Sequence, residues 1–377
     1  MGDESKIKVW VMSNEFEPKI VGGLGIVATQ LTRMLSKLGA KVTVLCPENS
    51  DRLTISNINS NLCIFRFPKN TKYFNRAKQS FKAEAIIKSA FAKGGVKPDI
   101  IHVHSTEFAD TAKLAGDRFD LPIVYTCHSL ASQGISSIHG KQQTTLIRIA
   151  NRIIVPSRWQ AKVTKRLYPR IDGKKMIVIP HGVAPVSKGS SIGASHKLLY
   201  VGRLIPSKGV EPLIKAVGLL AQENRKVHLT IVGSGKASYR NKLRTLVKQA
   251  GVVKRIHWAE KNPYKTVQQM YGSYGAVINP SKKESFCLVS LEAMANGVPL
   301  ISTTSGGMRE FVTSQNAKII HSIDSAHIAR AIKEFWNNPE QARKRVINAR
   351  TTAAQYKWPV IARKYLSLFS DLKLGRP

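Results

Sequence analysis

Short apolar runs alternate with longer amphipathic stretches along most of the chain. Residues 6–13 alternate apolar and polar positions, which predicts a strand. Residues 27–38 repeat apolar positions every three or four residues, which predicts a helix, and 41–46 predict the next strand. The same order restarts at 197–201 and 210–223. This order is typical of a doubly wound parallel sheet, so we expect an α/β fold.

The restart of the pattern also indicates two domains. A chain of 377 residues is long enough for two hydrophobic cores. Residues 184–196 are rich in Ser, Gly and Ala, as expected of a connection between domains. We therefore predict an N-terminal Rossmann-like domain over 1–185 and a second over 186–357, followed by a terminal helix over 358–377.

The charge of the chain is strongly positive: 59 basic and 23 acidic residues give +36. Residues 1–185 contribute 28 − 13 = +15, and residues 186–377 contribute 31 − 10 = +21. Such a field favours an anionic lipid surface, a phosphorylated acceptor or nucleic acid. The alternative, a surface that only confers solubility, fits the charge equally well. No specific nucleic acid is predicted.

One basic segment raises a membrane hypothesis of its own. We predict a helix from about Arg76 to Lys93, in which basic residues are interleaved with aromatic ones that begin at Tyr73. A basic amphipathic segment of this kind can lie on a membrane surface. We favour an ordinary surface helix, with Phe81, Ala85 and Ile86 toward the core.

The cellular setting follows from what the sequence lacks. It has no uncharged apolar run of 18 residues, and its first residues carry no signal-peptide core. Its four cysteines are scattered without a C-x-x-C pair, which argues against zinc and fits a reducing compartment. We expect a cytoplasmic protein, with peripheral attachment to the inner face of the membrane as an alternative.

Several strand ends carry candidate chemistry. Arg203 and Lys208 follow a predicted strand in a glycine-containing loop, and a guanidinium with an ammonium there can clamp a diphosphate. Glu284 and Glu292 lie eight positions apart, before and inside a helix, and can accept hydrogen bonds from sugar hydroxyls. His128 ends a strand, at the edge where α/β folds bind ligands.

These motifs resemble glycosyltransferase family 4. The resemblance is carried by Val-Gly-Arg203 with Lys208-Gly, by Pro-Ser followed by Glu-x7-Glu and Ala-Met-Ala-x-Gly-x-Pro, by the Gly22-Gly23 loop and by Thr-Cys-His128. It implies a GT-B fold: two Rossmann-like domains facing each other across a cleft, with 358–377 packing back on the first. It also implies sugar transfer from a nucleotide-sugar with retention of configuration, without a metal or other cofactor.

The resemblance assigns roles to residues of this chain. It implies that His128, Glu284, Arg203 and Lys208 are catalytic. The implied donor-binding residues are Gly22, Gly23, Arg203, Lys208, Glu284, Ser285, Phe286, Cys287, Leu288, Val289 and Glu292. A UDP-sugar is the first expectation, with GDP- and ADP-sugars left open. The acceptor is a glycan, a lipid-linked or a small-molecule hydroxyl.

Two positions depart from the family pattern. Cys287 stands where the family usually has Gly, and Ala184 where it usually has Asp. They support a second hypothesis, in which a GT-B scaffold without activity binds an anionic polymer, nucleic acid or a membrane. The joint presence of Arg203, Lys208 and both glutamates favours the transferase.

Overall fold

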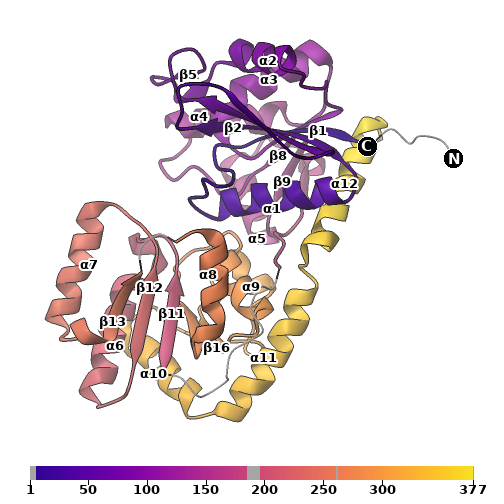
Figure 1. Ribbon diagram of the computed structural model, residues 1–377. Helices are drawn as coiled ribbons and strands as arrows, with labels where there is room; N and C mark the ends of the chain where they lie inside the picture. The colour runs from indigo at the N-terminus through magenta and orange to yellow at the C-terminus, as the bar shows by residue number, and fades with distance from the viewer. Residues whose placement is uncertain (1–5, 185–195, 260–261, 377) are drawn as a thin grey trace. The chain divides into compact units, whose positions relative to one another are not determined.

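The computed structural model describes residues 6–184, 196–259 and 262–376. It divides into two compact units (Figure 1). Unit 1 is Met1–Gly182 with Trp358–Pro377, and unit 2 is Val183–Lys357. The predicted connection at 184–196 lies, except for its first and last residues, outside the described residues. The predicted boundary between 185 and 186 therefore stays a prediction.

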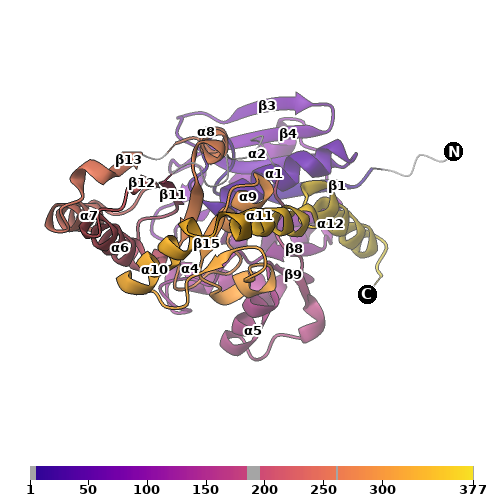
Figure 2. The ribbon, with the colours of Figure 1, turned by 90° about the horizontal axis from the view of Figure 1, so that it is seen from below.

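Unit 1 is built on one twisted sheet of eight strands in the order β10-β9-β8-β7-β1-β2-β4-β3. Neighbouring strands are parallel except β3 and β4, which pair antiparallel at the edge, side by side in Figure 2. The strands are β1 (Lys8–Met12), β2 (Lys41–Glu48), β3 (Thr54–Asn59), β4 (Leu62–Pro68), β7 (Ile100–Val103), β8 (Ile123–Thr126), β9 (Arg152–Val155) and β10 (Met176–Val178). The central strands β7 and β8 are buried on both faces because helices cover both.

Helices cover the two faces of this sheet, with α2 and α3 on one side and α1 on the other (Figure 1). The helices are α1 (Gly23–Lys37), α2 (Ala83–Ala92), α3 (Ala109–Phe119), α4 (Ile138–Ile149), α5 (Arg158–Leu167) and α12 (Trp358–Lys373). The terminal helix α12 belongs to unit 1, where it packs against α1 and β7. Its buried stripe includes Ile361, Tyr365 and Phe369.

The predicted helix at 76–93 is wrong in its first half. Residues 74–81 form a small hairpin of β5 (Phe74–Asn75) and β6 (Ser80–Phe81), and α2 begins only at Ala83. Tyr73, Phe74 and Phe81 are 5%, 9% and 1% exposed and pack into the core of unit 1. These rings are therefore unavailable to a membrane, which removes the aromatic half of the membrane hypothesis for this segment.

Unit 2 has a six-stranded parallel sheet in the order β13-β12-β11-β14-β15-β16. The strands are β11 (Lys197–Val201), β12 (His228–Val232), β13 (Ile256–Ala259), β14 (Ala276–Asn279), β15 (Leu300–Ser302) and β16 (Lys318–Ile319). The order reverses between β11 and β14. At such a switch point the following loops run in opposite directions and leave a crevice at the carboxyl ends of the strands, where α/β folds bind ligands.

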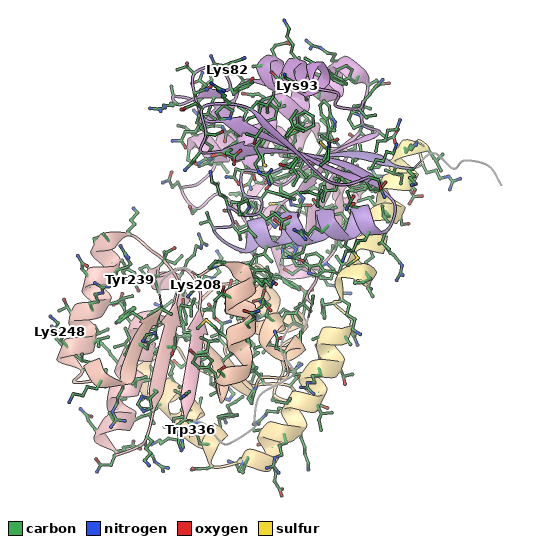
Figure 3. All side chains as sticks on the ribbon, in the orientation of Figure 1. Lys82, Lys93, Lys208, Tyr239, Lys248 and Trp336 are labelled. Atoms are coloured by element: carbon green, nitrogen blue, oxygen red, sulfur yellow. The ribbon has the colours of Figure 1, made fainter. Side chains whose placement is uncertain are left out.

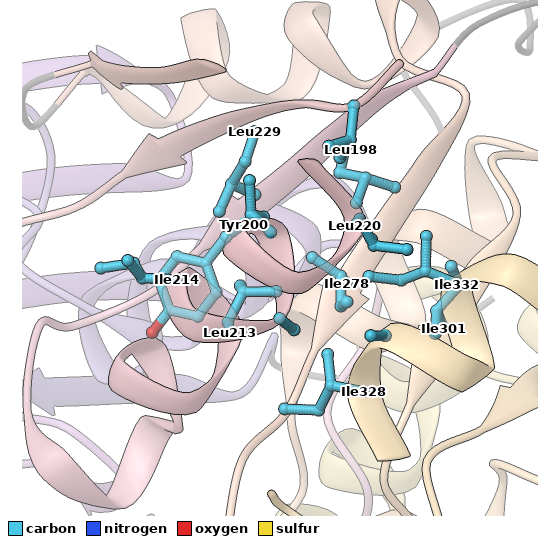
Figure 4. Packing of buried hydrophobic residues seen from close by; sticks show 14 of the residues in the cluster. Leu198, Tyr200, Leu213, Ile214, Leu220, Leu229, Ile278, Ile301, Ile328 and Ile332 are labelled. Atoms are coloured by element: carbon cyan, nitrogen blue, oxygen red, sulfur yellow. The ribbon is translucent and has the colours of Figure 1, made fainter. Parts of the chain in front are cut away.

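The core of unit 2 lies between this sheet and its helices. Figure 4 shows Leu198, Tyr200 and Leu229 of the sheet packed against Leu213, Ile214 and Leu220 of α6. The helices are α6 (Val210–Gln222), α7 (Ala237–Gln249), α8 (Tyr264–Met270), α9 (Leu288–Ala295), α10 (Ser325–Trp336) and α11 (Pro339–Ala354). These apolar residues recur at helical and strand spacing, which is why the order of elements could be predicted.

Candidate active site

The predicted diphosphate clamp lies at the switch point of unit 2. Arg203 and Lys208 lie in the loop after β11, and Glu284 lies in the loop after β14. Lys208 Nζ and Glu284 Oε1 are 2.5 Å apart, and the two side chains are only 16% and 12% exposed. Figure 3 shows Lys208 near one end of the strands of unit 2. The fold thus joins two residues that lie 76 positions apart in the sequence.

Backbone contacts hold these two loops together. The N–H of Lys282 donates to the carbonyl of Ser207 at 2.8 Å. Gly209 has φ +71°, and a Cβ there would lie 2.1 Å from the carbonyl oxygen of Pro280. Only glycine fits this close approach and this backbone conformation. The Lys208–Glu284 pair is therefore fixed by main-chain geometry as well as by its own attraction.

The glycine turn at 306–307 lies against the backbone of Glu284. The N–H of Gly307 donates to the carbonyl of Glu284 at 2.9 Å, so this donor is already used. A Cβ on Gly306, whose φ is +63°, would lie 2.0 Å from the same carbonyl. The turn therefore positions the backbone of Glu284.

Glu292 lies inside α9 and is 2% exposed. Its Oε2 accepts a hydrogen bond from the hydroxyl of Tyr271 at 2.8 Å. Its Oε1 is buried and has no hydrogen-bond partner among the residues that the structure describes. Burial raises the pKa of Glu292, against smaller opposing effects of nearby side chains that include Tyr271. A buried carboxylate with one free oxygen suits a hydroxyl donor such as a ribose.

Cys287 has φ +82°, a conformation that favours glycine. Its Sγ accepts a hydrogen bond from Asn279 Nδ2 at 3.2 Å and lies 3.4 Å from Ser290 Oγ. Burial raises the pKa of the thiol to about 12, so it is a neutral, unreactive group despite its place before a helix. A cysteine thus adopts a backbone conformation here that is usual for glycine.

The predicted donor-binding residues next to Cys287 differ in how far their side chains are buried. Phe286 is 2% exposed and its ring packs 5.1 Å from that of Phe311, so it can meet a donor only through its backbone. Leu288 is also buried, whereas Ser285 and Val289 are half-buried.

The predicted glycine loop of unit 1 opens α1 but already holds an anion. The carboxylate of Glu15 accepts hydrogen bonds from the N–H groups of Val21 and Gly22, both at 2.9 Å. A Cβ on Gly25 would lie 2.8 Å from Glu15 Cβ and from its Oε2. Gly22 and Gly23 therefore lie at the start of α1, where a carboxylate of the same unit accepts from the two N–H groups that precede the helix. The role of Glu15 could not be predicted from the sequence, because its partner amides follow six and seven residues later without a motif.

His128 belongs to a cluster of four histidines in unit 1, with His102, His104 and His181. His104 Nδ1 and His128 Nε2 are 2.9 Å apart, and the ring of His181 lies 5.2 Å from that of His128. His102 of β7 and His104, just after this strand, have ring centroids 4.2 Å apart. His181 was missed as a cluster member, since it comes from the end of another strand.

Burial dominates the chemistry of this cluster. It lowers the pKa of His102 and of His128 to about 3, and it lowers the pKa of His104 and His181 as well. The rings are therefore neutral at pH 7, and one ring donates to the next as the other accepts. Among the described residues no group of three His, Cys, Asp or Glu is placed to hold a metal ion.

Two doubly wound α/β units, one with a paired cation and carboxylate at its switch point, match the GT-B fold that the sequence predicts. Comparison with known proteins makes this class specific. The family model described as "Glycosyltransferase Family 4" matches residues 21–186, and that described as "Glycosyl transferases group 1" matches 188–352. The chain belongs to this family and is an enzyme of the hexosyltransferase class.

Similar proteins agree with this assignment. The glycogen synthase of Mycobacterium tuberculosis is 24% identical, over 98% of this chain and 96% of its own length. A D-inositol 3-phosphate glycosyltransferase of Xylanimonas cellulosilytica is 22% identical, over 94% and 93%. The solved structure of sucrose-phosphate synthase from Thermosynechococcus elongatus has a TM-score of 0.81 at 20% identity, and covers 98% of this chain and 100% of its own. Among the described helices, none is long and apolar enough to cross a membrane.

Proposed function

We propose that the enzyme moves a hexose from a nucleotide-diphosphate sugar to a hydroxyl of a glycan, a lipid-linked or a small-molecule acceptor, with retention of configuration. The observation that carries this proposal is the Lys208–Glu284 pair at the unit 2 switch point, beside exposed Arg203. Two proteins of the same fold support the choice of donor. HepE of Anabaena was solved with UDP and glucose, and starch synthase IV of Arabidopsis thaliana with ADP and acarbose.

Lys208 and Glu284 would each contact a different part of the donor. A diphosphate placed beside Arg203 and Lys208 would meet two cations, and these would stabilise the negative charge that develops on the leaving group. Lys208 would then be shared between the diphosphate and Glu284, which frees acceptor capacity on Glu284 for sugar hydroxyls. Oε1 of Glu292 would accept from the ribose. We expect a UDP-sugar first, with ADP- and GDP-sugars open.

In unit 1, His128 is proposed as a catalytic residue that acts as a neutral hydrogen-bonding group. Its lowered pKa makes an imidazolium at pH 7 unfavourable, so it would orient a hydroxyl rather than neutralise charge. Retention without an enzymic nucleophile fits attack by the acceptor on the face that the diphosphate leaves. The cations of unit 2 would then supply the main stabilisation of the transition state.

Calorimetric titration with UDP, ADP and GDP tests the donor site. We expect one nucleotide to bind the wild type and to bind Lys208→Met and Glu292→Gln at least tenfold more weakly, about 1.4 kcal/mol or more. The matched control is Lys333→Met, which removes an exposed lysine whose Nζ lies 2.8 Å from Glu223 Oε1. Equal loss in Lys208→Met and Lys333→Met would refute the site.

The same titration separates the transferase from the inactive binding scaffold. A scaffold would bind polyanions but no nucleotide diphosphate. If none of the three nucleotides binds while heparin does, the proposed function is wrong and the scaffold hypothesis replaces it.

A further inference from the structure

We propose that unit 1 docks on an anionic membrane surface through one face, at which two exposed isoleucines stand among unpaired cations. This isoleucine face consists of Arg76, Lys78, Ile135, Ile138 and Lys141. The interaction is separate from sugar transfer and does not depend on the proposed donor or acceptor.

Hydrogen bonds from one buried side chain hold the two parts of the isoleucine face together. Arg76 and Lys78 lie at the tip of the β5–β6 hairpin, and Ile138 and Lys141 lie in the first turn of α4. The side chain of Gln142 is 9% exposed, and its Nε2 donates to the carbonyl oxygens of Lys78 and Gln79, each at 3.0 Å. Figure 1 shows β5 and α4 on the same side of unit 1.

Hydrogen bonds fix the backbone turn that carries the two exposed isoleucines. Ile135 is 45% exposed and Ile138 is 41% exposed. Ser137 lies between them: its Oγ donates to the carbonyl of Gly134 at 2.7 Å and accepts from the N–H of Gly140 at 3.0 Å. A Cβ on Gly140 would lie 2.1 Å from the oxygen of Gly134, so the turn is packed tightly against the helix. The turn therefore presents two apolar side chains from a defined backbone.

The charge around these isoleucines has one sign. No Asp or Glu occurs between Asp120 and Asp172, or in residues 69–83. Arg76, Lys78 and Lys141 are exposed, and none of them forms an ion pair with another described residue. On the neighbouring elements, Glu84 pairs with Arg118 and Glu107 with Lys69, which leaves the exposed Asp110 of α3 as the acid beside this region.

This combination fits a bilayer surface better than nucleic acid. Lipid headgroups attract Lys and Arg, while short apolar side chains enter the boundary with the acyl chains. A single-stranded nucleic acid would need exposed aromatic rings for stacking. The rings of this region, Tyr73, Phe74 and Phe81, are buried. The residue types of the isoleucine face therefore favour an anionic bilayer as its partner.

Co-sedimentation of the full chain with vesicles tests the proposal. We expect binding to phosphatidylcholine vesicles that contain phosphatidylglycerol, little binding to phosphatidylcholine alone, and a loss of binding at high salt. Lys78→Gln with Lys141→Gln should lower the partition coefficient roughly twentyfold, from about fivefold for each cation removed. The charge-matched control, Lys248→Gln with Lys254→Gln, alters exposed lysines of unit 2 and should change it less than twofold.

The isoleucines make the test specific, because replacing them leaves the charge unchanged. Ile135→Ser with Ile138→Ser should lower vesicle binding about tenfold or more and leave heparin and RNA binding unaltered. The control Ile347→Ser, at a residue that is 65% exposed in unit 2, should have no effect. The proposal is overturned if the isoleucine variant binds vesicles as the wild type does. It is also overturned if no anionic vesicle binds, or if RNA binds and the vesicles do not.

Discussion

The four clustered histidines His102, His104, His128 and His181 should make the stability of unit 1 fall as the pH drops below about 6.5. In the folded unit burial lowers the pKa of His102 and His128 to about 3, from 6.5, and shifts His104 and His181 in the same direction. As the pH falls, the unfolded chain binds protons before the folded unit does. Stability is therefore complete above pH 6.5, and is lost progressively from there toward pH 3.

The size of the effect follows from these pKa values. At pH 5.5 an unfolded histidine is about nine-tenths protonated and the buried one is neutral. This difference lowers the free energy of unfolding by about 1.4 kcal/mol for each histidine. His102 and His128 together give about 3 kcal/mol, a sizeable part of the roughly 5–15 kcal/mol that is usual for a domain. His104 and His181 add to the loss in the same direction. The raised pKa of Glu292 belongs to unit 2 and acts in the opposite direction there.

Urea unfolding at a series of pH values measures this loss. Wild-type protein should show a steep fall of the unit 1 transition below pH 6.5. His104→Gln should remove about one proton from the pH dependence, or about 1.4 kcal/mol per pH unit. The matched control is His228→Gln, which alters an exposed histidine of β12 and should leave the dependence unchanged. The reasoning is refuted if His104→Gln and the wild type have the same slope.

Three further predictions concern single residues. Glu292→Gln should leave unit 2 as stable as the wild type or more so in urea unfolding at pH 7, because the raised pKa means that the carboxylate is unfavourable in the folded state; clear destabilisation would contradict this. Cys287→Gly should change stability by less than about 1 kcal/mol, since relief at φ +82° offsets lost sulfur contacts, whereas Cys287→Val should cost about 2 kcal/mol or more. Glu15→Gln should cost about 1–3 kcal/mol of unit 1 stability, because it weakens the acceptor of two backbone N–H groups; a cost no larger than that of Glu48→Gln would show that the glycine loop does not need the carboxylate.

Most of the fold could be predicted because its signals are local. The spacing of apolar residues distinguishes strands from helices, and the alternation of the two predicts a parallel sheet. The donor motifs were found for the same reason, since Arg203 and Lys208 lie five residues apart in one loop. The hairpin at 74–81 was missed because its two-residue strands are too short for a periodic pattern. The edge strand β3 was missed because its residues are mostly polar and exposed.

What the sequence could not predict is the meeting of residues from different elements. Lys208 and Glu284 are joined by the switch point, and His181 reaches His128 from another strand end. The contact made by Glu15 is harder to predict, because an acidic residue before a glycine loop matches no known sequence motif. Its contact with Val21 and Gly22 depends on the path of the intervening chain, which the sequence leaves undetermined.

The loops that follow the strands carry different chemical groups in the two units. This difference supports different roles for the two units in the proposed reaction. In unit 2 the loops at the switch point carry Arg203 and Lys208, and the latter is paired with a carboxylate from which a diphosphate could draw it away. In unit 1 the corresponding glycine loop is already occupied by Glu15, and the nearby strand ends carry neutral histidines. A second phosphate site on unit 1 would have to displace a covalently tethered carboxylate that two N–H groups hold. The phosphate-binding half of the proposed reaction is therefore best assigned to unit 2, which leaves unit 1 with groups suited to uncharged hydroxyls.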